Sequence, residues 1–328
     1  MLTVRSAGPL TTVQDRGRPG WAHLGVPRSG AVDLPALGRA NALVGNALGA
    51  AALEVTLGGL VAVFDTDAVV AVTGARCPLS VAGVPAAHAT AVGVPAGAEL
   101  RLDASRSGVR GYLAVAGGIA VEPVLGSRST DTLAGLGPAR VAAGDQLPTG
   151  GFSSTSGGLL APAADPDAPA ADPDAPTADL DAPTADLDAP AADLDLAGVW
   201  AGSVARRVRE PAIPAEPVLR VHPGPRADWF TPAARRLLHE AQWTVTPAGD
   251  RVGARLDGPA LERAIEGELP SEGMVAGALQ VPPGAGPVVF LADHPVTGGY
   301  PVIAVVDPDD LWLAGQARPG TPLRFRPA

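Results

Sequence analysis

The polar residues that could do chemistry stand in two loop systems, one in each half of the chain. Residues 270–304 read PSEGMVAGALQVPPGAGPVVFLADHPVTGGYPVIA, with polar side chains among glycines and prolines between apolar strands. Glycine and proline fix the backbone shape and let a ligand approach main-chain N–H groups closely. This composition predicts a binding surface. Its polar members are Ser271, Glu272, Gln280, Asp293, Thr297 and Tyr300.

The first loop system lies near the N-terminus. Residues 11–33 read TTVQDRGRPGWAHLGVPRSGAVD and mix Gln, Asp, Arg and Ser with Gly and Pro in the same way. Binding residues commonly stand on loops that a rigid scaffold positions. Two such loop systems, one per half, predict a single composite site.

The composition excludes several kinds of catalysis. All 24 basic residues are arginines, and the chain has no lysine. It therefore has no Schiff-base lysine, no P-loop lysine and no lysine on this chain to which biotin could be attached. Cys77 is the one cysteine, which excludes an intramolecular disulfide, and its residue type predicts a buried side chain.

No generic catalytic motif is present. The sequence has no GxxxxGK[ST], HExxH or GxSxG segment and no dinucleotide-binding glycine fingerprint. The five histidines are scattered, and no two stand at metal-ligand spacing, so no metal site is predicted. The N-terminus lacks a signal-peptide pattern, and no run approaches eighteen apolar residues, which favours a cytoplasmic protein.

An acidic repeat divides the chain. Five seven-residue units from Ala161 to Asp195 each carry two aspartates and no base, so they hold ten of the 34 acidic residues. The other 24 acidic residues balance the 24 arginines. A proline in every unit argues against a coiled coil and favours an extended, disordered linker. We therefore predict a β-rich half over 1–149, a linker over 150–202 and a second β-rich half over 203–328.

Short apolar runs separated by Gly and Pro predict strands in both halves, and two longer amphipathic segments predict helices. One helix begins after Asp33 as N-cap and runs to Asn46, which is expected to cap its end; another begins after Thr231 and runs to about Gln242. A short helix is expected near 309–314. The fold class predicted is mainly β with a few helices, with a closed or nearly closed barrel in each half. The predicted strands are 53–57, 60–64, 68–73, 99–102, 112–116, 218–221, 243–246, 278–281, 288–292, 302–306 and 323–325.

Nine segments in a fixed order carry a family resemblance over both halves. Together they resemble the biotin-dependent carboxyltransferase family, which includes the C subunit of 5-oxoprolinase (PxpC), the regulator KipA and the second subunit of allophanate-hydrolase-type operons. The segments are TTVQDRGRPGW, GVPRSGAVD, ANALVGN, YLAVAGGI, VLGSRSTDT, HPGPRADWF, DRVGARLDGP, SEGMVAGALQVPP and VTGGYPVIA.

The resemblance implies a cyclophilin-like β-barrel architecture and a protein that acts as one subunit of a complex. It implies the C subunit of an ATP-dependent 5-oxoprolinase, which converts 5-oxo-L-proline to L-glutamate with a KipI-like B subunit (PxpB) and a LamB/YcsF-like A subunit (PxpA). ATP, with Mg²⁺ as a further possibility, is the expected cofactor, at a site shared with the partners. Two alternatives stay open: a carboxyltransferase that moves a carboxyl group from biotin to urea or a related amide, and a KipA-type regulator that binds a KipI-like kinase inhibitor.

The reaction so implied assigns expected roles to the loop residues. A lactam is a poor electrophile, so activation by ATP needs donors for phosphate oxygens and a carboxylate for proton transfer or metal binding. Asp15, Glu272 and Asp293 are the expected catalytic carboxylates. The structural alternatives are an Asp15–Arg18 pair, backbone hydrogen bonds from Gln14 and Gln280, and tight turns at Gly298 and Gly299. The expected substrate-binding residues are Gln14, Arg18, Ser29, Arg128, Ser271, Gln280, Thr297, Gly298, Gly299 and Tyr300.

Overall fold

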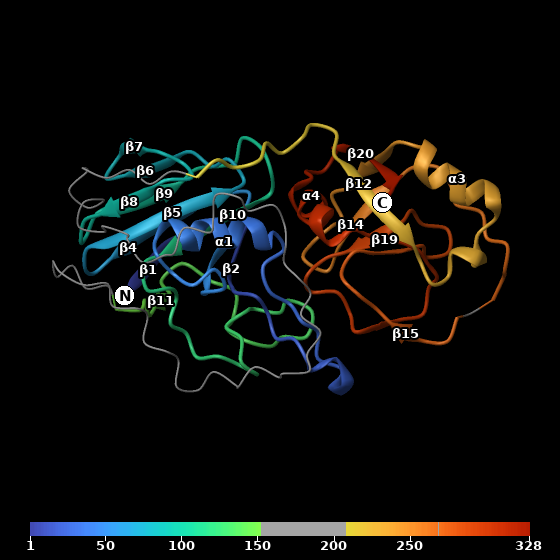
Figure 1. Ribbon diagram of the computed structural model, residues 1–328. Helices are drawn as coiled ribbons and strands as arrows, with labels where there is room; N and C mark the ends of the chain where they lie inside the picture. Colours follow the sequence, from blue (N-terminus) through green and yellow to red (C-terminus); the bar gives the residue numbers. More distant parts are fainter. Residues whose placement is uncertain (152–207, 268) are drawn as a thin grey trace.

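The computed structural model describes residues 1–151 and 208–328, apart from residue 268. Of the linker predicted over 150–202, only residues 150 and 151 are described, and the acidic repeat lies outside the described residues. Figure 1 shows two β-rich bodies side by side, the N-terminal half in blue and green and the C-terminal half in yellow to red. Among the described residues, no helix has the length and apolar character needed to cross a membrane.

The N-terminal half is built on two antiparallel sheets. The first has the order β11-β1-β4-β9-β6-β7, and the second has the order β2-β3-β10-β5-β8. The strands of the first sheet are β1 (Leu2–Ala7), β4 (Leu60–Phe64), β6 (Leu79–Val81), β7 (Val84–Ala86), β9 (Glu99–Leu102) and β11 (Gln146–Leu147). Those of the second are β2 (Leu10–Gln14), β3 (Ala52–Thr56), β5 (Ala68–Gly74), β8 (Ala91–Val94) and β10 (Arg110–Val115).

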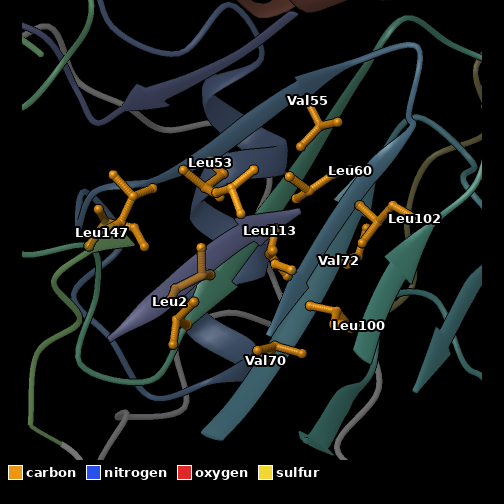
Figure 2. Packing of buried hydrophobic residues seen from close by; sticks show 14 of the residues in the cluster. Leu2, Leu53, Val55, Leu60, Val70, Val72, Leu100, Leu102, Leu113 and Leu147 are labelled. Carbon is orange, nitrogen blue, oxygen red and sulfur yellow. The ribbon is translucent and has the colours of Figure 1, made fainter. Parts of the chain in front are cut away.

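The main core of this half lies between the two sheets (Figure 2). Leu2, Leu60 and Leu100 come from the first sheet and meet Leu53 and Leu113 of the second. Helix α1 (Leu34–Leu43) covers the other face of the second sheet, where a separate apolar cluster includes Tyr112. The half therefore has three layers, and the inner sheet carries buried residues on both faces.

Helix α1 begins as the sequence predicts and ends earlier. The Asp33 carboxylate accepts a hydrogen bond from Ala36 N at 2.8 Å, and Pro35 occupies the first turn. The helix ends at Leu43, however, so the expectation that Asn46 caps it was wrong. Asn46 instead donates to Val115 O at 2.8 Å and accepts from Gly117 N, which ties the chain after α1 to the end of β10.

The C-terminal half is a closed barrel with the strand order β12-β19-β16-β17-β14-β13-β20. Its seven strands are β12 (Val218–Pro223), β13 (Trp243–Val245), β14 (Gly253–Asp257), β16 (Ala278–Gln280), β17 (Val288–Phe290), β19 (Val302–Val306) and β20 (Pro322–Pro327). Closure leaves no free sheet edge. The fully buried Trp243 packs against Phe325 inside, with ring centroids 6.5 Å apart.

Helices α3 (Pro232–Glu240) and α4 (Leu311–Gln316) pack on this barrel. Thr231 caps α3 through Ala234 N at 3.1 Å, as predicted. Outside the barrel, β15 (Glu272–Gly273) pairs with β18 (Thr297–Gly298) to form a two-stranded arm. Short 3₁₀ turns complete the described elements: η1 (Ala22–Leu24), η3 (Ala227–Trp229) and η4 (Pro308–Asp310).

The structure confirms a mainly β protein with few helices, and all eleven predicted strands fall on observed ones. A second expectation was wrong: among the described residues a barrel closes only in the C-terminal half, because the strands of the N-terminal half divide between two open sheets. Strands β1, β2 and β14, of five or six residues, were not predicted, because polar residues and glycine interrupt their apolar runs. The short strands β6, β7, β8 and β11 and the arm were not predicted either, since two to four residues carry little periodicity. Cys77 is buried as expected, and burial raises the pKa of its thiol to about 11.

Candidate functional site

The two halves meet around the buried carboxylate of Asp293, which follows β17. Ser29 Oγ donates to Asp293 Oδ1 at 2.7 Å, and Thr132 donates to Oδ2 from its main-chain N at 2.8 Å and from its hydroxyl at 2.7 Å. Arg251 adds two further bonds, at 2.9 and 3.0 Å. Burial opposes the charge on Asp293, yet Arg251 and the other donors hold its pKa below the ordinary value. Asp293 is therefore a charged anchor between the halves.

Arg251 carries this connection deeper into the N-terminal half. Its guanidinium pairs closely with Glu54 of β3 and donates to Gly30 O at 2.6 Å. Tyr112 OH and Val32 N also donate to Glu54, at 2.7 and 3.0 Å. A buried charge is tolerated when a partner and hydrogen bonds replace water. We call Ser29, Glu54, Arg251 and Asp293 the seam network.

A second junction lies beside the seam network. Gln316, at the end of α4, donates to Asp33 Oδ2 and to Arg110 O, each at 2.8 Å, and accepts from Arg110 N at 3.0 Å. The Arg110 guanidinium bonds closely to Gly315 O and donates to Asp250 O at 3.0 Å. Burial raises the pKa of Asp33 despite the nearby Arg39. These bonds join the second sheet directly to the barrel half.

Asp15 organises the loop that leads to Ser29. Its carboxylate accepts from Gly17 N at 2.7 Å, from Ser127 Oγ at 2.7 Å, from Arg128 N at 2.6 Å and from Ser129 Oγ. These donors fasten residues 15–17 to residues 127–129. The observed role of Asp15 is therefore to hold two loops of the N-terminal half together.

The side chains of Gln14 and Arg18 are also buried inside the protein. Gln14 Nε2 donates to Thr130 O at 2.9 Å, and Arg18 bonds closely to Ser129 O, with Asp131 at 3.9 Å. Burial lowers the pKa of Arg18, while Asp131 favours its charge. Arg128 donates to Val121 O at 2.7 Å. These predicted binding residues lie next to the seam network, and their observed contacts hold the loop at 121–132.

Ser29 has an unusual backbone. Its φ is 53°, in the left-handed region that side chains other than glycine rarely adopt, and Gly30 follows with φ 98°. Residues held in such conformations often mark functional sites, because the surrounding contacts must maintain them. Here a main-chain bond from Ala31 N to Asp15 O at 2.9 Å and the bond to Asp293 fix the turn.

The remaining predicted residues lie on the arm or next to it, with Gln280 at the end of barrel strand β16. Glu272 pairs with Arg226, and this hydrogen-bonded ion pair lowers the pKa of Glu272. Gln280 Nε2 donates to Tyr300 O at 3.2 Å. Gly298 lies against the Gln280 amide, where a Cβ would come within 2.6 Å. Exposed side chains lie at Ser271, Thr297 and Tyr300, while Gly299 is half-buried.

His294 and the chain after it connect the seam network to the arm. His294 follows Asp293, stacks on Phe290 with centroids 6.1 Å apart, and its Nδ1 lies 2.9 Å from Pro295 O. Burial lowers the pKa of His294, so the neutral ring is favoured. Three residues further on, Thr297 enters the arm. The predicted composite site is thus brought together at Ser29 and Asp293, with the arm residues beyond His294.

Several residues of the site were not predicted. Glu54 stands in the apolar strand segment ALEVT, and Gln316 stands in the short apolar helix LWLAGQ. A single charged or amide side chain inside a buried segment is a usable signal, because such a group needs a specific partner. Thr132, Ser127 and Ser129 carry no such signal. Within residues 1–151 and 208–328, residue 268 aside, no three His, Cys, Asp or Glu side chains are grouped so as to hold a metal ion.

Comparison with known proteins places this arrangement in a family. Residues 24–327 match the model of the carboxyltransferase domain, subdomain A and B. The chain is 34% identical to the 5-oxoprolinase C subunit of Escherichia coli K12 over 99% of its own length and 90% of that protein. It is 32% identical to the urea amidolyase of Lachancea kluyveri, of which it covers 17%.

Solved structures show the same fold in longer chains. The chain matches TTHA0988 with a TM-score of 0.77 and 34% identity, covering 99% of this chain and 56% of that one. It matches the urea carboxylase of Kluyveromyces lactis with a TM-score of 0.79 and 27% identity, covering 99% of this chain and 27% of that one. The fold described above is therefore found elsewhere as one part of larger proteins.

Proposed function

Since this chain belongs to the carboxyltransferase domain family, we propose that it works as the C subunit of an ATP-dependent 5-oxoprolinase. The observation that carries the proposal is its 34% identity to the Escherichia coli 5-oxoprolinase C subunit, which extends over 90% of that relative. A second C subunit of this kind, from Haemophilus influenzae, is 29% identical over the same share. The similarity is not confined to one domain or motif.

We propose that the reaction needs a B subunit of the KipI type (PxpB) and an A subunit of the LamB/YcsF type (PxpA). The contacts of the predicted catalytic carboxylates support dependence on partners. Asp15 and Asp293 are each surrounded by donors from this chain, and Glu272 is paired with Arg226. Despite burial, Arg251 keeps the pKa of Asp293 below its ordinary value, and the hydrogen bond from Arg226 lowers that of Glu272, so both are poor proton acceptors. Both carboxylate oxygens of Asp15 are engaged by donors of this chain. The group that moves the proton then comes from a partner.

The substrate is proposed to lie against the seam network, beside Ser29 and His294. The lactam oxygen would take the γ-phosphoryl group of ATP and release ADP. One water would then add to the ring carbon and the C–N bond would open to give an acyl phosphate, which a second water would hydrolyse to the free carboxylate and phosphate. For this chain, the residues suited to a phosphate are exposed arginines. Arg16 and Arg28 are exposed on the loop that carries Ser29, while Arg18 and Arg251 are occupied inside the protein. A Mg²⁺ ion would come with the nucleotide or a partner.

One observation favours a second candidate, a carboxyltransferase that uses biotin on a separate carrier. Urea amidolyases and a solved urea carboxylase match 99% of this chain. In that reading the same site would take urea or a related amide. The two are distinguished by the co-reactant, since one reaction consumes ATP and the other needs a carboxylated biotin carrier.

Purified chain, alone and with its A and B partners, tests the proposal. Glutamate and phosphate should form from 5-oxoproline and ATP only when all three subunits are present. The proposal would be contradicted if the A and B subunits turned over 5-oxoproline equally well without this chain. Carboxyl transfer from a carboxylated biotin carrier to urea, without 5-oxoproline turnover, would select the second candidate. We also propose a cytoplasmic location, where ATP is available.

A further inference from the structure

The chain that leads into the barrel half buries a carboxylate in the N-terminal half. The Glu210 side chain is only 2% exposed. Its Oε1 accepts from Gly74 N at 2.6 Å, and its Oε2 lies 2.9 Å from His88 Nδ1 and 3.3 Å from Arg76 Nη1. Arg39 Nε completes the set at 4.0 Å. One carboxylate is thus enclosed by a main-chain N–H group and three basic side chains.

The groups around Glu210 are held by the N-terminal half itself. Arg39 belongs to α1, and Gly74 ends β5 with a φ of 80°, where a Cβ would meet Arg110 O at 2.6 Å. His88 is oriented by a contact of its other ring nitrogen with Ala75 O at 3.1 Å. We call Arg39, Gly74, Arg76 and His88 the carboxylate socket. Because these anchors do not involve residue 210, Gly74 N and the His88 ring are positioned independently of Glu210.

The chemistry of the socket suits an anion. Burial would push the pKa of Glu210 upward, but the hydrogen bond and charge of His88, Gly74 N and Arg39 hold that pKa below its ordinary value. In the described part of the chain, the ion pairs of Arg39, Arg76 and His88 all go to Glu210. Removing this one carboxylate would leave Arg39 and His88, 12% and 13% exposed, without their partner.

Space for a small solute adjoins the socket. A cavity of about 400 Å³ is lined by Arg76, Ala89, Val208, Arg209 and Glu210. The chain beside it is fastened by a main-chain bond from Val208 N to Ala89 O at 3.1 Å. A small acid entering this cavity would therefore reach the position that the Glu210 carboxylate occupies.

We propose that the socket is a carboxylate-binding site that Glu210 fills in cis, and that a small free carboxylate occupies it when the Glu210 side chain is removed. With Glu210 in place, the site clasps the chain between the halves onto the N-terminal half. This site is separate from the seam network, and the proposal does not depend on the proposed function.

Chemical rescue tests the proposal. Glu210→Ala removes the carboxymethyl group that acetate resembles, so its melting temperature should fall by about 5 °C or more in chloride buffer. Acetate at matched ionic strength should restore at least half of that loss. Wild-type protein should not respond. Glu216→Ala serves as the matched control, because the Glu216 side chain is 41% exposed and pairs with Arg324 at the surface.

Glu210→Gln provides the opposing control. Its side chain still fills the socket without a negative charge, so it should be destabilised and should not respond to acetate. Equal stabilisation of all variants by acetate, no recovery of Glu210→Ala, or a Glu210→Ala loss no larger than that of Glu216→Ala would overturn the proposal. If Glu210→Ala is recovered only as insoluble protein, its refolding yield in acetate against chloride makes the same comparison. A yield that does not depend on acetate would equally overturn it.

Discussion

Ser29 Oγ donates a hydrogen bond to Asp293 Oδ1 at 2.7 Å, although the two residues lie 264 positions apart in the sequence. This bond joins the first loop system of the chain to the second and lies where the two halves meet. Arg251 holds the same carboxylate from the other side and passes the connection on to Glu54. The site of this protein is therefore organised by a buried charge network that neither half could form alone.

Replacing Asp293 by Asn should destabilise the protein strongly. The change leaves Arg251 with one buried carboxylate instead of two, and loss of one partner of a buried pair costs about 3–5 kcal/mol. Urea unfolding measures the free energy directly. Asp309→Asn is the matched control, because the Asp309 side chain is 54% exposed, and it should change stability far less. Equal losses for the two variants would contradict the role of Asp293 as an anchor.

Stability should fall in acid, in part because of Asp293. Its pKa in the folded protein lies below the unfolded value of 3.8, so it contributes stability above about pH 4 that is lost as the pH falls through the folded pKa. Asp33 and Asp131, whose pKa values burial raises, act in the opposite direction. Unfolding free energies measured from pH 6 to pH 3 should therefore decline less steeply in Asp293→Asn than in the wild type. A parallel decline would contradict the assignment.

Arg251 and Asp293 should be coupled energetically. We expect Arg251→Met to be at least as destabilising as Asp293→Asn, because it leaves both Glu54 and Asp293 buried without their cation. The double variant should lose less than the two single losses added together, by roughly 1–3 kcal/mol. A double-mutant cycle from urea unfolding measures this difference. Additive losses would show that the two residues act independently.

Two substitutions of Ser29 should distinguish the effect of backbone strain on stability from the effect of the hydrogen bond to Asp293. Ser29→Ala loses the bond to Asp293 and keeps an unfavourable left-handed φ, whereas Ser29→Gly loses the bond and removes the steric cost. The glycine variant should therefore be the more stable of the two by about 1 kcal/mol. Thermal unfolding of both variants checks the order, and the reverse order would show that the turn is not strained.

The arm should matter for assembly or turnover rather than for stability. Tyr300 is 45% exposed, and the Glu272–Arg226 pair lies at the surface. Glu272→Ala and Tyr300→Ala should each change the melting temperature by only about 1 °C. Affinity for the B subunit and turnover of the assembled complex are measured separately. If neither the affinity for the B subunit nor the turnover changed in these variants, the arm would not be part of the functional site.

Eleven strands were predictable because turn-forming residues bound their apolar runs, as Gly59 and Asp65 do at Leu60–Phe64. The caps Asp33 and Thr231 were predictable from local chemistry alone. The division of the N-terminal strands between two sheets was not, because sheet membership depends on pairing between distant segments. The same limit applies to the site. Ser29 and Asp293 could be predicted as polar loop residues, but the hydrogen bond between them depends on how the two halves pack. The pairing of Glu54 with Arg251 depends on the same packing.

Reconstitution is the most direct test of the central claim that this chain is a partner-dependent component of a 5-oxoprolinase. Glutamate formation from 5-oxoproline and ATP is measured with the A and B subunits, with and without this chain. The account predicts turnover only in the complete mixture, and loss of that turnover with a folded seam-network variant such as Ser29→Ala. Turnover by this chain alone, or by A and B without it, would contradict the account.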